Sequence, residues 1–171
     1  IQVKAFLSRE IRPQELEDLG FKRLGSSFQE DVYYSAPNWR SPLSNEMMRI
    51  RKEAGRYSLS YKGPLKKGPL CVKPKIEFEV EEGLKDALEK LGYKKMLSLA
   101  KERQMFLGED GMEIVIDRIE NNGRFLEFRV KSAEGELRIF ELLEKLGIKK
   151  KDVTKKSYLE LLLKKSKKTS A

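Results

Sequence analysis

Residues 114–130 read IVIDRIENNGRFLEFRV, and this stretch sets a pattern that much of the chain repeats. In its second part, Leu126, Phe128 and Val130 follow one another at every second position. The opposite face of the same segment consists of Phe125, Glu127, Arg129 and Lys131. Apolar side chains at every second position are typical of a β-strand that is buried on one side. The stretch therefore predicts strands with one apolar face and one charged face.

The same alternation continues outward in both directions. It predicts eight strands, which cover residues 1–7, 28–34, 47–53, 56–62, 73–81, 97–107, 112–120 and 124–131. Leucines at helical spacing predict four helices, over residues 13–20, 83–91, 134–146 and about 155–166. The tail at 166–171 is polar, and we expect it to fray.

Two of the predicted helices end alike, with LEKLGY at 88–93 and LEKLGI at 143–148. This likeness suggests two related halves, each with strands and a helix. Leu, Glu and Lys are common in helices, so chance similarity explains it equally well. The loop at 62–74 is rich in proline, glycine and lysine, and it is either a flexible basic lid or a plain surface loop.

The composition limits the chemistry. The chain has 171 residues, enough for one domain or at most two small ones. It has no His and a single Cys, Cys71, which excludes histidine-dependent triads, imidazole ligands and an internal disulfide. Any metal must then be held by carboxylates, which favours Mg²⁺ or Mn²⁺. The 36 basic and 27 acidic residues give a net charge of +9, which fits either a basic surface or an anionic ligand.

The sequence also indicates where the protein works. No apolar run approaches 18 residues, so we expect no transmembrane helix and no membrane partner. The charged start, with Lys4 and Arg9, argues against a signal peptide and favours a cytoplasmic protein. Abundant Lys and Glu, with few Asn, Gln and Cys, are compatible with a thermophile.

Charges recur on the predicted strands at the positions that alternate with the apolar ones. The cations are Lys4, Arg49, Arg51, Lys62, Lys73, Lys75, Lys101, Arg103 and Arg129. The carboxylates are Glu77, Glu79, Glu81, Glu113, Asp117 and Glu127. If the strands close into an eight-stranded antiparallel β-barrel with helices outside, an α+β fold, the charged faces line its interior. Such a lining would clamp a polyphosphate, and its carboxylates would hold a divalent ion. Two packed halves whose charged sheet faces are exposed to solvent would give the same alternation.

Several motifs then occur in a specific order along the chain. They are IQVKAFL (1–7), QEDVYYSAP (29–37), MRIRKE (48–53), SLSYKGP (58–64), KPKIEFEV (73–80), KERQMF (101–106), the 114–130 stretch and SYLELL (157–162). In this order they resemble the CYTH superfamily, also called triphosphate tunnel metalloenzymes. The family includes class IV adenylyl cyclases, thiamine triphosphatases and inorganic tripolyphosphatases. The YKGP and SYLELL pieces are most similar to the cyclase-like branch.

The resemblance implies a tunnel domain over residues 1–165 and a triphosphate substrate, namely ATP, thiamine triphosphate or tripolyphosphate. It implies Mg²⁺ or Mn²⁺ as the cofactor. The phosphate-binding residues that it implies are Lys4, Arg49, Arg51, Lys62, Lys101 and Arg103, with Lys73 or Lys75. The implied metal ligands are Glu77, Glu79, Asp117 and Glu127. Candidates for the catalytic base are Lys4, Glu79 and Glu127.

Two positions depart from the family pattern. The opening ExExK motif has Gln2 at its second glutamate, and its first glutamate would precede Ile1. The closing ExE motif consists of Glu127 and Arg129. Gln2 keeps an oxygen but loses the charge, whereas Arg129 would repel a metal cation and join the phosphate-binding residues. The site would then bind a triphosphate with less metal, or with none.

The sequence leaves several functions open. In a hydrolase, a metal-activated water attacks the terminal phosphorus; in a cyclase, the ribose 3′-hydroxyl attacks the α-phosphorus and pyrophosphate leaves. Gln2 and Arg129 favour a module that binds a triphosphate without turnover, whereas the remaining carboxylates favour metal chemistry. Nucleic-acid binding by the lysine runs at 149–151, 155–156 and 164–168 is less favoured, because such runs are usually solvated helix faces and tails.

Overall fold

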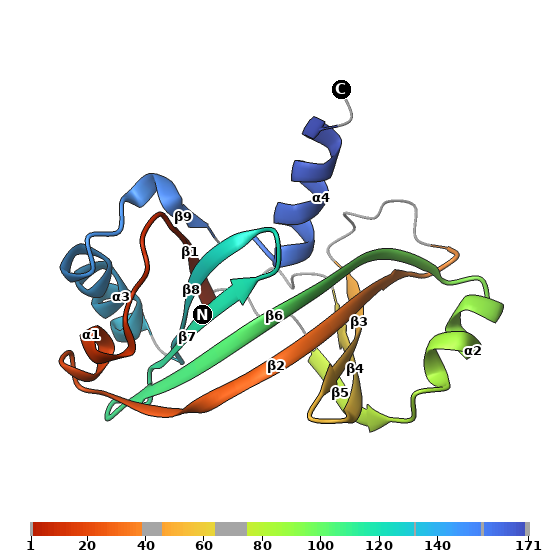
Figure 1. Ribbon diagram of the computed structural model, residues 1–171, viewed down its shortest axis with the longest axis horizontal. Coiled ribbons are helices and arrows are strands. Elements are labelled where there is room, and N and C mark those ends of the chain that lie inside the picture. Colours follow the sequence, from red (N-terminus) through yellow and green to blue (C-terminus); the bar gives the residue numbers. More distant parts are fainter. Residues whose placement is uncertain (1, 39–45, 64–74, 132, 155, 170–171) are drawn as a thin grey trace. The chain divides into compact units, whose positions relative to one another are not determined.

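The computed structural model describes residues 2–38, 46–63, 75–131, 133–154 and 156–169, and Figure 1 shows its helices and strands. The chain forms two compact units. The first unit contains residues 1–27 and 101–157, and the second contains residues 28–100 and 158–171. Two strands of 15 residues, β2 (Phe21–Ser35) and β6 (Lys94–Gly108), contribute to both units.

The first unit combines antiparallel strands with short helices. Its strands are β1 (Gln2–Leu7), β7 (Glu113–Ile119), β8 (Gly123–Arg129), β9 (Val153–Thr154) and parts of β2 and β6. Its helices are α1 (Pro13–Glu17), α3 (Ala133–Lys145) and the 3-10 turn η1 (Lys150–Asp152). Strand β8 pairs with β1 on one side and with β7 on the other, and β7 pairs with β6.

The core of the first unit lies between these strands and the helices. Val3 on β1, Ile114 on β7 and Phe128 on β8 belong to one buried cluster with Leu16 of α1 and Ile139 of α3. These strand residues occupy alternate positions, so their neighbours in sequence lie on the other face of the sheet. The apolar face is therefore the face covered by α1 and α3.

The second unit repeats this arrangement. Its strands are β3 (Met47–Glu53), β4 (Arg56–Lys62), β5 (Lys75–Val80) and the remaining parts of β2 and β6, and its helices are α2 (Leu84–Lys90) and α4 (Tyr158–Thr169). Tyr34, Ile50 and Tyr57 on the strands form a core with Leu88 of α2. Within each unit, the expected division into an apolar face toward helices and a charged face away from them is confirmed.

The strands follow the order β5-β4-β3-β2-β6-β7-β8-β1-β9 in one sheet, and every strand pair whose register is described is antiparallel. The expected α+β class, an antiparallel sheet with helices, is confirmed. The described residues show no pairing between β5 and β9, so the expected closed barrel is not confirmed. The ninth strand, β9, has only two residues, too few to produce a visible alternation.

Both LEKLG sequences end their helices in the same way. Gly92 has a φ of 86° and Gly147 a φ of 68°, which glycine adopts without steric cost. The amide of Tyr93 donates to the carbonyl of Leu88 at 3.0 Å, and the amide of Ile148 donates to that of Leu143 at 2.8 Å. These contacts define a Schellman motif, with one copy in each unit. The shared sequence therefore has a shared local structure.

Some bounds differ from the prediction. Strand β2 begins at Phe21 rather than at 28. Most side chains between 22 and 28 are exposed, so this segment has no apolar alternation from which a strand could be predicted. Helix α4 continues to Thr169, because lysines are good helix formers. No helix in the described part of the chain is long and apolar enough to cross a membrane.

Candidate functional site

The charged face of the first unit gathers side chains from four strands. We call these residues the first charged cluster: Lys4 on β1, Lys101 and Arg103 on β6, Glu113 and Asp117 on β7, and Glu127 and Arg129 on β8. The antiparallel register aligns them, because Lys4 lies opposite Glu127, Asp117 lies opposite Arg103, and Glu113 lies opposite Arg129. Alternation along each strand and register across the sheet thus bring them to one face.

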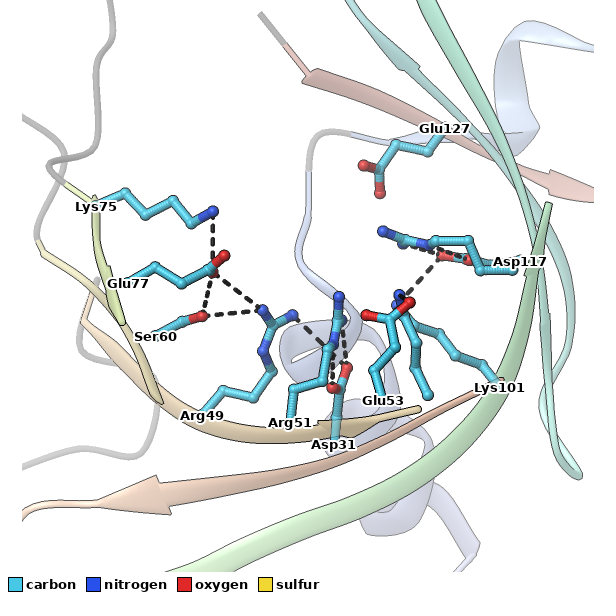
Figure 2. Close-up of polar contacts among 12 residues, drawn as sticks. Asp31, Arg49, Arg51, Glu53, Ser60, Lys75, Glu77, Lys101, Asp117 and Glu127 are labelled. Carbon is cyan, nitrogen blue, oxygen red and sulfur yellow. Dashed lines mark hydrogen bonds and ion pairs between the residues drawn. The ribbon is translucent and has the colours of Figure 1, made fainter. Parts of the chain in front are cut away.

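Asp117 holds two cations of β6. Its carboxylate is fully buried and accepts hydrogen bonds from Arg103 Nε at 2.7 Å and Arg103 Nη2 at 2.5 Å. Lys101 Nζ lies 3.4 Å from the same carboxylate. Figure 2 marks this ion pair with a dashed line. The side chains of Lys101 and Arg103 are themselves almost completely buried. A two-pronged arginine–carboxylate pair fixes the guanidinium plane, so Asp117 orients both cations.

Glu127 holds the other two cations. Its carboxylate is 1% exposed, and it accepts a hydrogen bond from Arg129 Nε at 2.6 Å while Lys4 Nζ lies 3.5 Å away. Burial alone would raise the pKa of Glu127. The charges of Lys4, Arg129 and Arg103 and the hydrogen bond from Arg129 outweigh burial, so its pKa lies well below the ordinary value. Glu127 is therefore a permanent anion at any physiological pH.

Arg129 links two carboxylates at the more open end of the cluster. Besides its contact with Glu127, its Nη1 lies 3.3 Å from Glu113 Oε2. The side chain of Arg129 is 35% exposed, unlike those of Lys4 and Lys101. On the neighbouring strand, the residue opposite Arg129 is Gln2. The two positions that depart from the family pattern are therefore direct cross-strand partners.

The second unit carries a group of its own, which we call the second charged cluster: Asp31, Arg49, Arg51, Ser60, Lys75 and Glu77. Asp31 is 1% exposed and accepts two hydrogen bonds from Arg51, at 2.7 and 2.8 Å. Arg49 Nη1 lies 3.6 Å from the same carboxylate. The Nε of Arg49 is buried and has no partner among the described residues.

A chain of polar contacts crosses the second charged cluster, and Figure 2 shows it. Arg49 Nη2 donates to Ser60 Oγ at 3.0 Å, and the hydroxyl of Ser60 donates to Glu77 Oε2 at 2.5 Å. Lys75 Nζ lies 3.0 Å from the same oxygen of Glu77. Burial raises the pKa of Glu77, but the hydrogen bonds from Ser60 and Lys75 and the nearby cations lower it further, so the net shift is downward.

The structure separates one predicted site residue, Glu79, from these clusters. Glu79 is 78% exposed and pairs with Arg56 near the turn between β3 and β4. Lys62 ends β4 opposite Lys75 of the second charged cluster, and Lys73 lies outside the described residues. Asp31 and Ser60 were not among the site residues predicted from the sequence. Asp31 alternates with the apolar residues of its strand just as the chosen cations do, so the same signal marks it.

The described carboxylates do not fit a divalent metal ion as they stand. In the part of the chain that the structure describes, no three acidic side chains form a group that could hold one. Each predicted metal ligand lies instead beside a cation: Asp117 beside Arg103, Glu127 beside Lys4 and Arg129, Glu77 beside Lys75, and Glu79 beside Arg56. The carboxylate oxygens that a hard cation needs are thus already engaged in ion pairs.

Comparison with known proteins places the chain in a family. The CYTH domain matches residues 1–158, so the chain belongs to the CYTH family, as its motifs predicted. A Methanocaldococcus jannaschii protein named "putative adenylate cyclase" is 33% identical over 156 residues, which span 86% of this chain and 89% of that protein.

Solved structures share the fold. A Pyrococcus horikoshii OT3 protein is 30% identical, with a TM-score of 0.76, over 94% of this chain and 98% of that one. A Hippeastrum protein described as a "putative adenylyl cyclase" with a dominant triphosphatase activity has a TM-score of 0.62 and 16% identity, over 94% of both chains. At that identity, the second likeness concerns the fold alone.

Proposed function

We propose that this protein binds a triphosphate through the cations of its charged strand faces. The observation that carries the proposal is the burial of three cations on one face, since Lys4, Lys101 and Arg103 are only 5%, 2% and 5% exposed. Removing a charge from water costs several kcal/mol unless fixed partners compensate. Asp117 and Glu127 supply such partners and hold the cations in fixed directions, as recognition of a polyanion requires.

The same groups suit turnover of the bound triphosphate. Hydrolysis and cyclisation both develop charge on phosphate oxygens, which fixed Lys and Arg side chains stabilise. The adenylate cyclase name of the 33% identical relative favours ATP among the candidate triphosphates. Glu127 is a poor candidate for the base because its lowered pKa makes it a weak proton acceptor, so we assign it the role of an electrostatic anchor.

A binding experiment tests the proposal at Lys4. Calorimetric titration with tripolyphosphate should show a loss of affinity of about tenfold or more in the Lys4→Gln variant. Lys22→Gln is the matched control, because it removes one lysine charge from an exposed position of β2 in the same unit. The control should bind within about twofold of the unmodified protein. Equal losses in the two variants would contradict the proposal, as would no binding by the unmodified protein.

Product analysis decides whether binding leads to turnover. The protein is incubated with ATP and with tripolyphosphate, each with Mg²⁺, Mn²⁺ or a chelator, and the products are separated by anion exchange. Cyclic AMP with pyrophosphate identifies a cyclase, and pyrophosphate with phosphate from tripolyphosphate identifies a hydrolase. Binding without products identifies a triphosphate-binding module, the alternative that Gln2 and Arg129 favour.

A further inference from the structure

Arg129 occupies the middle of a row that crosses three strands. Glu113 on β7, Arg129 on β8 and Gln2 on β1 lie directly opposite one another in register. The guanidinium of Arg129 lies 2.6 Å from Glu127 and 3.3 Å from Glu113, so one fixed cation joins two carboxylates. It therefore stands where an ion shared by these carboxylates would otherwise have to bind.

The charge balance of the cluster depends on this residue. In the first charged cluster, four cations face three carboxylates, so the cluster is cationic as it stands. A glutamate at position 129 would leave three cations and four carboxylates, and a cluster of that sign attracts a metal ion rather than a phosphate. Glutamine at position 2 offers a neutral oxygen and adds no charge to oppose Arg129.

We propose that Arg129 is a built-in substitute for a divalent ion, so that the first charged cluster binds triphosphate without metal. The inference rests on the proposed function and deepens it, since it names the free polyphosphate anion, rather than its metal complex, as the ligand. A guanidinium is suited to this role because it stays protonated and presents several donors in a fixed plane to phosphate oxygens. It pairs with both Glu113 and Glu127 and faces the phosphate when the ligand enters.

The test restores the carboxylates of the family motif in the double variant Gln2→Glu/Arg129→Glu. Its matched control is Lys22→Gln/Arg23→Glu, which makes the same total charge change at exposed positions of β2 in the same unit. Binding of Mn²⁺ alone is followed by the loss of the free-ion electron paramagnetic resonance signal. Binding of tripolyphosphate is followed by calorimetry in the presence of a chelator.

We expect the unmodified protein and the control to bind tripolyphosphate in chelator and to leave Mn²⁺ free. The double variant should bind Mn²⁺ at least about tenfold more tightly than either and lose about tenfold or more in tripolyphosphate affinity in chelator. If the double variant does not fold, Arg129→Gln should show the same loss of tripolyphosphate affinity, and Arg129→Lys should restore most of it.

Three results would overturn the inference, and they separate it from the proposed function. Stoichiometric Mn²⁺ binding by the unmodified protein would show that Arg129 does not replace the ion. Tripolyphosphate binding that requires Mg²⁺ would leave the proposed function standing and remove this inference. Absence of tripolyphosphate binding both with and without metal would remove both.

Discussion

At Glu127, burial and ion pairing act on one carboxylate in opposite directions. Burial raises its pKa, while Lys4, Arg129 and Arg103 lower it further than burial raises it. In the folded protein, the pKa of Glu127 thus lies below the ordinary value of 4.5 that holds in the unfolded chain. A carboxylate with a lowered pKa stabilises the fold at pH values above its unfolded pKa, and this contribution is lost as the pH falls toward the folded pKa.

This linkage gives a prediction for Glu127→Gln. At neutral pH the variant leaves Lys4 and Arg129 without their anion, and the free energy of unfolding should fall by about 3–5 kcal/mol. Urea denaturation at a series of pH values should show that the difference from the unmodified protein is full above about pH 4.5 and shrinks below it. Glu113→Gln, at a 46% exposed carboxylate, is the control and should cost much less. A difference that does not change with pH would contradict the account.

Asp31 has a comparable position in the second unit. It is fully enclosed and carries the paired hydrogen bonds of Arg51. Asp31→Asn removes the anion beside two arginines and should lower the free energy of unfolding by about 3–5 kcal/mol in urea denaturation. Glu30→Gln, at the exposed neighbouring position, should change it by less than about 0.5 kcal/mol. Similar losses in the two variants would show that the Asp31 pair contributes nothing of its own.

At the scale of elements, substitution of the glycine in LEKLG tests whether this sequence ends a helix. Gly147→Ala puts a side chain at a φ of 68°, where no atom lies within 4 Å of the new Cβ. The expected loss of about 1 kcal/mol therefore comes from backbone strain alone. Gly83→Ala is the control, because Gly83 has a φ of −59° and equally open surroundings. Thermal denaturation should show a lower midpoint for Gly147→Ala than for the unmodified protein and no lowering for the control. Equal midpoints in the two variants would contradict this explanation.

The sequence predicted those elements whose two faces differ. Strands β3 and β4 begin and end at the predicted residues. In β3, Met48 and Ile50 alternate with Arg49 and Arg51, and in β4 the apolar residues Tyr57, Leu59 and Tyr61 alternate with polar ones. The first part of β2 escaped prediction, because Lys22, Arg23 and Ser26 are exposed together with Leu24. An alternation cannot be seen in a segment that buries neither face.

At the scale of the whole molecule, the charged residues of the strand faces were visible in the sequence, but the ion pairs among them were not. Alternation alone identified the cations, among them Lys4 and Arg103, and the antiparallel register then aligned them with their carboxylates. Pairing depends on register, which one strand does not reveal. Glu79 shows the limit, since it alternates like Glu77 yet lies exposed beside Arg56. Closure of the sheet is also a property of many strands together, and the described strands do not confirm it.

The net charge of +9 raises the question of whether any polyanion would bind. Attraction between a basic surface and a nucleic acid depends on the release of counterions and weakens steeply with added salt. Lys4, Lys101 and Arg103 of the first charged cluster, by contrast, are buried, and buried charges are screened much less by salt. The two modes of binding therefore differ in their dependence on salt and on the length of the phosphate chain.

The most direct test of a triphosphate site is a calorimetric comparison of phosphate, pyrophosphate, tripolyphosphate and a short duplex DNA at low and at physiological salt. The account predicts one saturable site for tripolyphosphate, an affinity that rises with each added phosphate, and retention of that order at physiological salt. Binding that is strongest for duplex DNA and disappears at physiological salt, with no preference for tripolyphosphate over phosphate, would contradict it.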